Sequence, residues 1–147
     1  MPAHNRARTL PRAVKSVLAQ SYKNLELLIV DDGSLDDTPA ILRAVDDPRV
    51  RTERLEPNRG AAAARNAALR RAAGHYIAYL DSDDYWDPDF LLIMAGILRA
   101  QNFRAGYAAL MIWSARDPES GDGRELQCLR FSPFNRSLLE NSNFISP

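Results

Sequence analysis

The chain has 147 residues, 46% hydrophobic and 26% charged, which is ordinary for one globular domain with a buried core. Nineteen basic and nineteen acidic residues cancel, so the composition gives no electrostatic argument for a nucleic-acid partner or a bare membrane surface. The single Cys128 excludes an intrachain disulfide and a cysteine-based zinc site, and it favours a reducing compartment.

Neither a transmembrane segment nor a signal peptide is predicted. The most apolar window covers residues 90–98, far short of the roughly 20 residues needed to span a bilayer. No charged start is followed by an apolar core, as a signal peptide requires. We therefore expect a soluble, cytoplasmic domain.

The first half of the chain predicts alternating helices and strands. Leu10, Val14 and Val17 recur at helical spacing, and Thr9 is suited to cap that helix. A mostly apolar strand follows, as expected when helices cover both faces of a sheet. In chain order we predict a loop over 1–8, a helix from 9, a strand over 25–30, a helix over 36–45, a more exposed strand over 50–55, and a helix over 61–73 closed by a left-handed Gly74.

The second half continues the alternation. The aromatic and β-branched run over 76–80 predicts a short buried strand. Asp87 and Pro88 suit the N-cap and first position of an apolar helix to about residue 101. Further predictions are strands over 107–113 and 126–131 and a short helix over 134–140. The class is α/β, with a mainly parallel sheet flanked by helices.

Carboxylates crowd the end of the predicted strand over 76–80. Asp81, Asp83 and Asp84 would lie at the carboxyl edge of the sheet, where such folds bind ligands, and they repel one another without a cation. A calcium loop of the EF-hand type is excluded because Trp86 occupies the position that requires glycine. Mg²⁺ or Mn²⁺, held by one or two carboxylates and by substrate phosphates, fits better. The alternative is a simple helix-capping turn.

A second acidic turn, Asp31 to Ser34, follows the strand over 25–30. Right-handed connections place it at the same sheet edge as the turn over 81–84. One of its carboxylates could accept a hydrogen bond from a nucleobase or a ribose hydroxyl; the alternative is an Asx-turn that leads into a helix. Arg65 could either pair with Asp81 or face a phosphate.

Four short motifs follow one another along the chain: VDDGS (30–34), DPRVR (47–51), NRGAAAARN (58–66) and YIAYLDSDDYWDP (76–88). Each motif alone is weak, but their order and spacing are strongly specific. Together they resemble the family 2 glycosyltransferases with the GT-A fold.

The resemblance implies metal-dependent transfer of a sugar, with inversion, from a nucleotide-sugar donor, expected to be a UDP-sugar. It assigns Asp32 to the base and Asp81, with Ser82 beside it, to the ribose or diphosphate side. Asp83 would bind the metal, shared with Asp81. The resemblance also assigns Arg65 and His4 to nucleotide binding. His4 stands where an aromatic ring of the family packs on the base. The alternative for His4 is a frayed terminus.

Two departures from the family pattern limit the expected activity. The apolar strand that usually precedes the Pro2–Asn5 turn is absent, and the catalytic base is expected beyond residue 147. We therefore expect the chain to be the nucleotide-sugar-binding portion of one partial catalytic domain over 1–147, with little or no transferase activity. A role in cell-wall or polysaccharide biosynthesis, at or near the inner face of the membrane, is implied; the acceptor (saccharide, lipid or protein) is not.

Three other classes of protein are alternatives to this interpretation. A signalling receiver domain needs a lysine on a later strand end, but Lys15 and Lys23 both precede the first acidic turn. A dinucleotide-binding domain needs a G-x-G-x-x-G turn, which the sequence lacks. A non-catalytic, self-associating module remains, in which the apolar helix over 90–98 and an unpaired strand edge would favour a homodimer.

Overall fold

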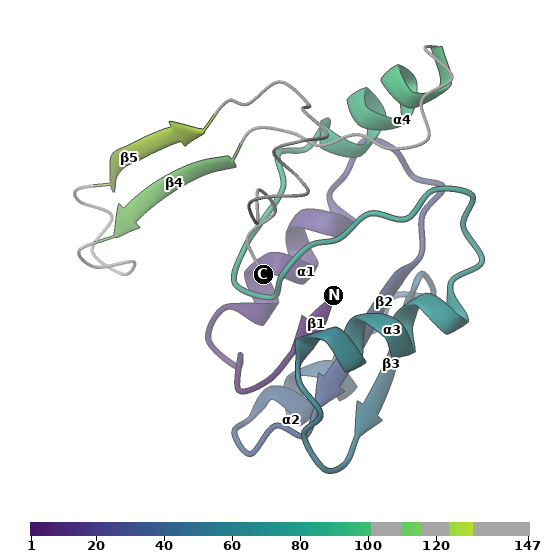
Figure 1. Ribbon diagram of the computed structural model, residues 1–147, viewed down its shortest axis with the longest axis vertical. Coiled ribbons are helices and arrows are strands. Elements are labelled where there is room, and N and C mark those ends of the chain that lie inside the picture. The colour runs from purple at the N-terminus through teal and green to yellow at the C-terminus, as the bar shows by residue number, and fades with distance from the viewer. Residues whose placement is uncertain (101–109, 116–123, 131–147) are drawn as a thin grey trace, which may run out of the picture. The chain divides into compact units, whose positions relative to one another are not determined.

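The computed structural model describes residues 1–100 and the strands over 110–115 and 124–130 (Figure 1). The chain divides into two units, Met1–Arg104 and Ala105–Pro147. Helices and parallel strands alternate from β1 to α3, so the predicted α/β class is confirmed.

The sheet of the first unit has three parallel strands in the order β1-β2-β3. They are β1 (Pro2–Ala3), β2 (Leu27–Asp32) and β3 (Val50–Leu55). β2 lies in the middle, with Ala3 opposite Asp31 on one side and Leu55 opposite Asp32 on the other. The prediction of a loop over 1–8 is therefore wrong at Pro2 and Ala3, because these two residues pair with the edge of β2.

Helices cover both faces of this sheet. α1 (Leu10–Leu18) and α2 (Thr38–Arg43) pack against Leu27 and Ile29 of β2. α3 (Ala61–Arg71) packs against Val30 on the other face, through Ala64 and Ala67. The apolar character of β2 thus follows from burial on both faces.

α1 confirms the prediction from helical spacing, since Leu10, Val14 and Val17 are all buried. The capping prediction is wrong: Thr9 precedes the helix, but its hydroxyl makes no capping hydrogen bond.

The glycine with an unusual backbone lies at the start of α3 and not at its end. Gly60 is the N-cap residue, with φ 87° and ψ 158°. The helix ends at Arg71, and Ala72 is already extended (φ −67°, ψ 131°), so the left-handed cap predicted at Gly74 is wrong. Instead, one oxygen of the Glu26 carboxylate accepts hydrogen bonds from the amides of Ala73 and Gly74, at 2.7 and 3.2 Å.

The predicted strand over 76–80 is also wrong. No strand is assigned there; Ile77 and Tyr79 are 45% and 58% exposed, and only Leu80 is buried. A strand needs a neighbour to complete its hydrogen bonds. β1 is only two residues long, so its free edge is too short to pair with a five-residue run.

α4 (Phe90–Ala100) begins later than predicted, because Asp87 to Asp89 form a turn before it. The buried Gln20 anchors this turn to the end of α1. Its amide donates to the carbonyl of Asp87 at 2.6 Å and accepts from the amide of Leu91 at 2.9 Å. Trp86 stacks on Phe90 and packs against the core.

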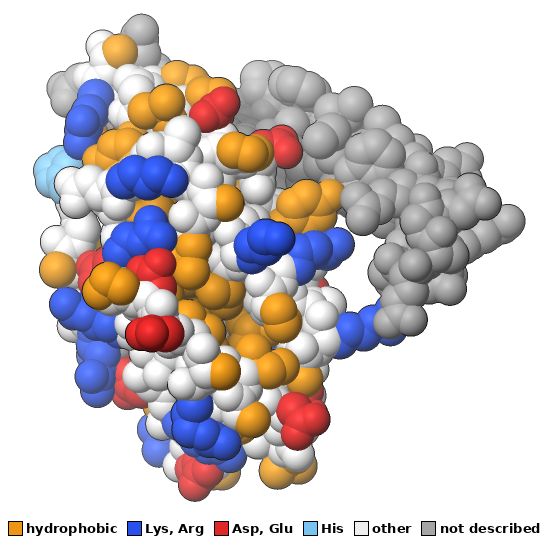
Figure 2. Space-filling view, turned by 180° about the vertical axis from the view of Figure 1, so that it is seen from behind, with side chains coloured by type: hydrophobic (Ala, Val, Ile, Leu, Met, Phe, Trp, Pro, Cys, Tyr) orange, Lys and Arg blue, Asp and Glu red, His pale blue; other side chains and the backbone are white. Residues whose placement is uncertain are grey.

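The second unit contains an antiparallel pair, β4 (Leu110–Ala115) and β5 (Arg124–Arg130), which overlaps the two strands predicted there. The helix predicted over 134–140 lies outside the described residues. Within the described part, no helix is long and apolar enough to cross a membrane. The face in Figure 2 intersperses both signs of charge with apolar side chains, in keeping with the zero formal net charge.

Candidate functional site

The candidate site lies at the carboxyl edge of the parallel sheet, where β1, β2 and β3 end. The segments over 4–9, 33–37 and 56–60 follow these strands directly, and ligands bind at such an edge in open α/β sheets.

The two carboxylates of the first acidic turn are both buried, at 2% exposure, and serve the backbone. Asp31 accepts the amide hydrogen of Ser34 at 3.0 Å and pairs with Arg54 at 2.6 Å, which is the Asx-turn alternative with an added ion pair. Asp32 accepts the amides of Arg59 and Gly60 through separate oxygens, at 2.8 and 2.7 Å. Asp32 therefore fixes the start of α3.

The exposed His4 ring is held in one tautomer by its neighbours. The Asp32 carbonyl oxygen lies 2.8 Å from Nδ1 and 2.9 Å from the side-chain nitrogen of Asn58, so it accepts from both. A proton on Nδ1 leaves Nε2 to accept from the Asn5 amide group at 3.2 Å. His4 is thus oriented by contacts to both of its ring nitrogens and is not frayed.

The loop after His4 is attached to the first acidic turn by its backbone. The amide of Asn5 donates to the Ser34 hydroxyl at 2.9 Å, and the amide of Arg6 donates to the buried Thr38 hydroxyl at 2.8 Å. In return, the Asn5 side chain accepts from the amide of Leu35 at 2.8 Å. These hydrogen bonds therefore hold the backbone of the loop against the segment over 34–38.

Arginines hold the second acidic turn. Arg65 of α3 donates to Asp81 at 2.7 Å, which is the ion-pair alternative for that residue. Nη2 of Arg6 lies 3.2 Å from a carboxylate oxygen of Asp83, and Arg12 of α1 donates to the Asp83 carbonyl at 3.1 Å. The loop containing Arg6 thus links the two acidic turns, through its backbone on one side and its side chain on the other.

The carboxylates of this second turn still repel one another. The pKa of Asp84 is raised above its ordinary value, first by burial and then by the charges of Asp83 and Asp81. Arg12 opposes the shift, and its guanidinium also lies 4.5 Å from the centre of the Tyr85 ring. Three carboxylates and three guanidinium groups are therefore gathered here. Within the chain itself, arginine side chains supply the positive charge that the crowded carboxylates require.

A divalent metal fits this turn only with help from a substrate. Among the described residues, no group of three or more His, Cys, Asp or Glu side chains is placed to hold an ion. Asp81 and Asp83 are two candidate oxygen ligands, each about one third to one half exposed. Mg²⁺ and Mn²⁺ commonly take one or two carboxylates together with substrate phosphates and water, so the two residues fit such an ion.

Sequence reasoning missed Arg6, Arg12 and Asn58. Charge balance was the available signal for the two arginines, since three acidic residues within four positions need nearby cations. Ser82 was predicted as a nucleotide contact, but its side chain is buried at 3% exposure.

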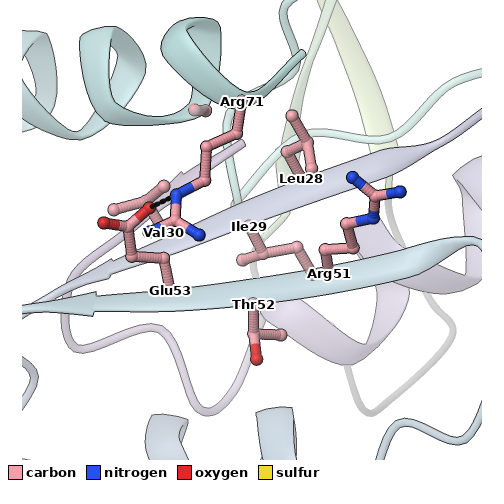
Figure 3. Close-up of a pocket in the computed structure, with 8 residues that line it drawn as sticks. Leu28, Ile29, Val30, Arg51, Thr52, Glu53 and Arg71 are labelled. Carbon is pink, nitrogen blue, oxygen red and sulfur yellow. Dashed lines mark ion pairs between the residues drawn. The ribbon is translucent and has the colours of Figure 1, made fainter. Parts of the chain in front are cut away.

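A hollow of about 290 Å³ lies away from this edge, over the middle of β2 and β3 beside α3 (Figure 3). Leu28 and Val30 contribute apolar surface, and the Arg71–Glu53 ion pair at 2.7 Å borders it. None of the predicted site residues lines the hollow. It is therefore separate from the candidate site.

Comparison with protein families and curated proteins gives consistent matches. The family model for Glycosyl transferase family 2 matches residues 1–141. The succinoglycan biosynthesis protein ExoO of Rhizobium meliloti is 46% identical over 125 residues, covering 85% of this chain and 34% of that protein. The Escherichia coli UDP-Glc:alpha-D-GlcNAc-diphosphoundecaprenol beta-1,3-glucosyltransferase WfaP is 49% identical over 84 residues, covering 57% and 34%. The chain spans about a third of the length of these relatives.

Solved structures match as well. S. aureus TarS 1-349 in complex with UDP gives a TM-score of 0.64 at 28% identity, covering 69% of this chain and 31% of that chain. A complex of the same TarS fragment with UDP-GlcNAc gives a TM-score of 0.63 at 27% identity, covering 69% and 30%. The likeness confirms the predicted fold class.

Proposed function

The chain belongs to glycosyl transferase family 2, and from this membership we propose that it binds the nucleotide-sugar donor of a metal-dependent, inverting glycosyltransferase. The observation that carries the proposal is the pair of carboxylates, Asp81 and Asp83, held by arginines from separate segments at the carboxyl edge of the sheet. A UDP-sugar is the proposed donor, because the TarS fragment is similar in fold and has been solved with UDP and with UDP-GlcNAc.

We assign the base of the donor to the side of the site formed by His4 and Asp32. The His4 ring is exposed and oriented, so it offers a face for stacking. Asp32 is 2% exposed and already accepts the amides of Arg59 and Gly60. A contact between its carboxylate and the base therefore requires the turn over 58–60 to shift.

The diphosphate belongs on the side of Arg65, Asp81 and Asp83, with the backbone of Ser82 beside it. Asp83, together with Asp81, would hold Mg²⁺ or Mn²⁺. The ion, when bound, neutralises charge that builds on the departing diphosphate. Arg65 adds a guanidinium to the same region, and a guanidinium can donate two parallel hydrogen bonds to a phosphate.

The acceptor and the catalytic base remain proposals about the whole protein. We propose a saccharide acceptor carried on a lipid diphosphate, because the acceptor in the WfaP name is of that kind. Such an acceptor implies that the whole enzyme acts at the inner face of the membrane. Because the chain spans about a third of the length of its relatives, we assign the base that deprotonates this hydroxyl to the rest of the whole protein, and residues 1–147 alone should show little or no transfer.

Calorimetric titration tests the proposal. The protein is titrated with UDP, GDP and dTDP, with and without Mn²⁺, and the titration is repeated on Asp83→Ala. We expect Mn²⁺-dependent binding of UDP, weakened more than about tenfold by Asp83→Ala, since removing a metal ligand should cost at least as much as removing its supporting residues.

Asp46→Ala is the matched control, because Asp46 is an exposed carboxylate with no described partner. It should leave UDP binding unchanged. A folded protein that binds none of the three nucleotides, with or without Mn²⁺, would contradict the proposal.

A second candidate function is that of a non-catalytic, self-associating module. Exposed apolar side chains on α4 favour it: Leu92, Ile93 and Ile97 are 51%, 56% and 48% exposed. The nucleotide titration separates the two functions, because a module of this kind has no need to bind UDP or Mn²⁺.

A further inference from the structure

Arg6 occupies the carboxylate that is assigned to the metal. Its guanidinium nitrogen lies 3.2 Å from the Asp83 oxygen, and the two side chains are 44% and 49% exposed. An ion pair this exposed to solvent is weak, so an incoming ligand can separate it readily.

The surroundings allow the Arg6 side chain to leave while everything else stays in place. The Arg6 backbone is held by the buried Thr38 hydroxyl, and its neighbour Ala7 donates to the Asp36 carboxylate at 3.0 Å. On the other side, Arg12 holds the carbonyl of Asp83 and not its carboxylate. Separating Arg6 from Asp83 therefore releases neither the loop nor the acidic turn.

Charge balance determines when the separation is favourable. Three carboxylates of the acidic turn face three arginines, so a divalent cation added alone would leave this region with excess positive charge. A nucleoside diphosphate brings negative charge for the displaced guanidinium to meet. Arg6 can pair with only one partner at a time, and a charge-assisted hydrogen bond to phosphate is stronger than its exposed ion pair.

We propose that Arg6 is an exchangeable counter-ion, paired with Asp83 in the free protein and transferred to the donor diphosphate when a divalent cation takes Asp83. This inference rests on the proposed function and adds a residue and a consequence to it. The consequence is positive coupling: the cation and the diphosphate each bind more tightly in the presence of the other. The cation takes Asp83 away from Arg6, and the diphosphate takes Arg6 away from Asp83.

The test measures metal binding itself, with no transfer reaction involved. Mn²⁺ binding is measured by calorimetry or by electron paramagnetic resonance, with and without UDP, in wild type, Arg6→Gln, Arg6→Lys and Arg8→Gln, correcting for Mn²⁺ bound by free UDP. Arg8 is the matched control, an exposed arginine on the same loop with no ion pair among the described contacts.

Arg6→Gln should bind Mn²⁺ alone about threefold more tightly, because the competitor for Asp83 is gone. The same variant should bind UDP, in the presence of Mn²⁺, about tenfold more weakly, because a charged phosphate contact is lost. Opposite changes in the two affinities are the signature of exchange. Arg6→Lys should restore part of the coupling, and Arg8→Gln should match wild type.

Two results would overturn the inference while leaving the proposed function intact. One is UDP binding that depends on Mn²⁺ equally in wild type and Arg6→Gln. The other is seen in wild type alone: uridine, which has no phosphate, raises Mn²⁺ affinity as much as UDP does. The second measurement can overturn the inference even if the Arg6 variants fail to fold. Absence of any nucleotide binding by folded wild type would instead overturn the proposed function.

Discussion

The three carboxylates proposed to meet the donor and the metal each have a protein partner. Asp32 accepts two backbone amides, while Asp81 and Asp83 pair with Arg65 and Arg6. Ligand binding at this edge is therefore an exchange of partners. The affinity for a donor is the difference between new contacts and the ones they replace, which makes the identity of each partner as important as the acidic motif.

Asp47 provides a test of a single ion pair through pH. Its two oxygens accept hydrogen bonds from Nε and Nη2 of Arg49, at 3.0 and 2.7 Å, and these contacts lower the pKa of Asp47 from 3.8 to about 2. Because the folded-state pKa lies below the unfolded one, the stabilisation is complete above about pH 4 and is lost as the pH falls toward 2.

We expect Asp47→Asn to lower Tm by a small, constant amount between about pH 5 and 7. The difference from wild type should shrink as the pH falls toward 2 in thermal melts followed by circular dichroism. Asp46→Asn, beside it, should show no such trend. A Tm difference that persists at the lowest pH would mean that the side chain acts through packing and not through its charge.

At the scale of elements, the turn before α3 has two roles: it begins the helix and it holds the Asp32 carboxylate. Gly60 adopts a backbone conformation that other residues avoid, and its amide donates to Asp32 at 2.7 Å. The geometry of this helix start therefore controls how the Asp32 carboxylate is presented. The sequence predicts the glycine with the unusual backbone at the end of this helix, at Gly74, whereas the structure has it at the start.

A pair of glycine variants tests this difference. Nothing lies within 4 Å of a Cβ added at Gly60 or at Gly96, so crowding is excluded at both. Gly60→Ala should lower the free energy of unfolding by about 1–3 kcal/mol through backbone strain alone. Gly96→Ala, inside α4, should raise it by about 0.5–1 kcal/mol. Urea unfolding measures both, and equal effects would contradict the assignment of strain to Gly60.

At the scale of the whole molecule, apolar surface is available for association. Ile93 and Ile97 are separated by one helical turn on α4, and each is about half exposed. Exposed apolar side chains on one face of a helix favour contact between copies of the chain.

We predict a homodimer at high protein concentration, measured by light scattering coupled to size exclusion. Ile97→Glu should shift the mass toward the monomer, because a buried unpaired carboxylate opposes association. Leu35→Glu is the control: it makes the same chemical change at a residue that is 90% exposed and lies outside α4. A monomeric mass at the highest concentration reached would count against association.

The sequence by itself determined the elements that depend on short-range pattern. α1 and β3 lie where they were predicted, and β2 is displaced by two residues. Helical spacing and apolar runs are local properties, so they survive without knowledge of neighbours. The order of four short motifs was likewise enough to predict the family.

Only the tertiary structure decided which groups meet at the site. Arg12 and Asp83 are 71 residues apart in the chain, and no local pattern pairs them. The same dependence on distant neighbours explains why the run over 76–80 forms no strand: its ladder needed a longer β1. Pairing of strands and of charges is a property of two segments at once, and one segment read alone does not contain it.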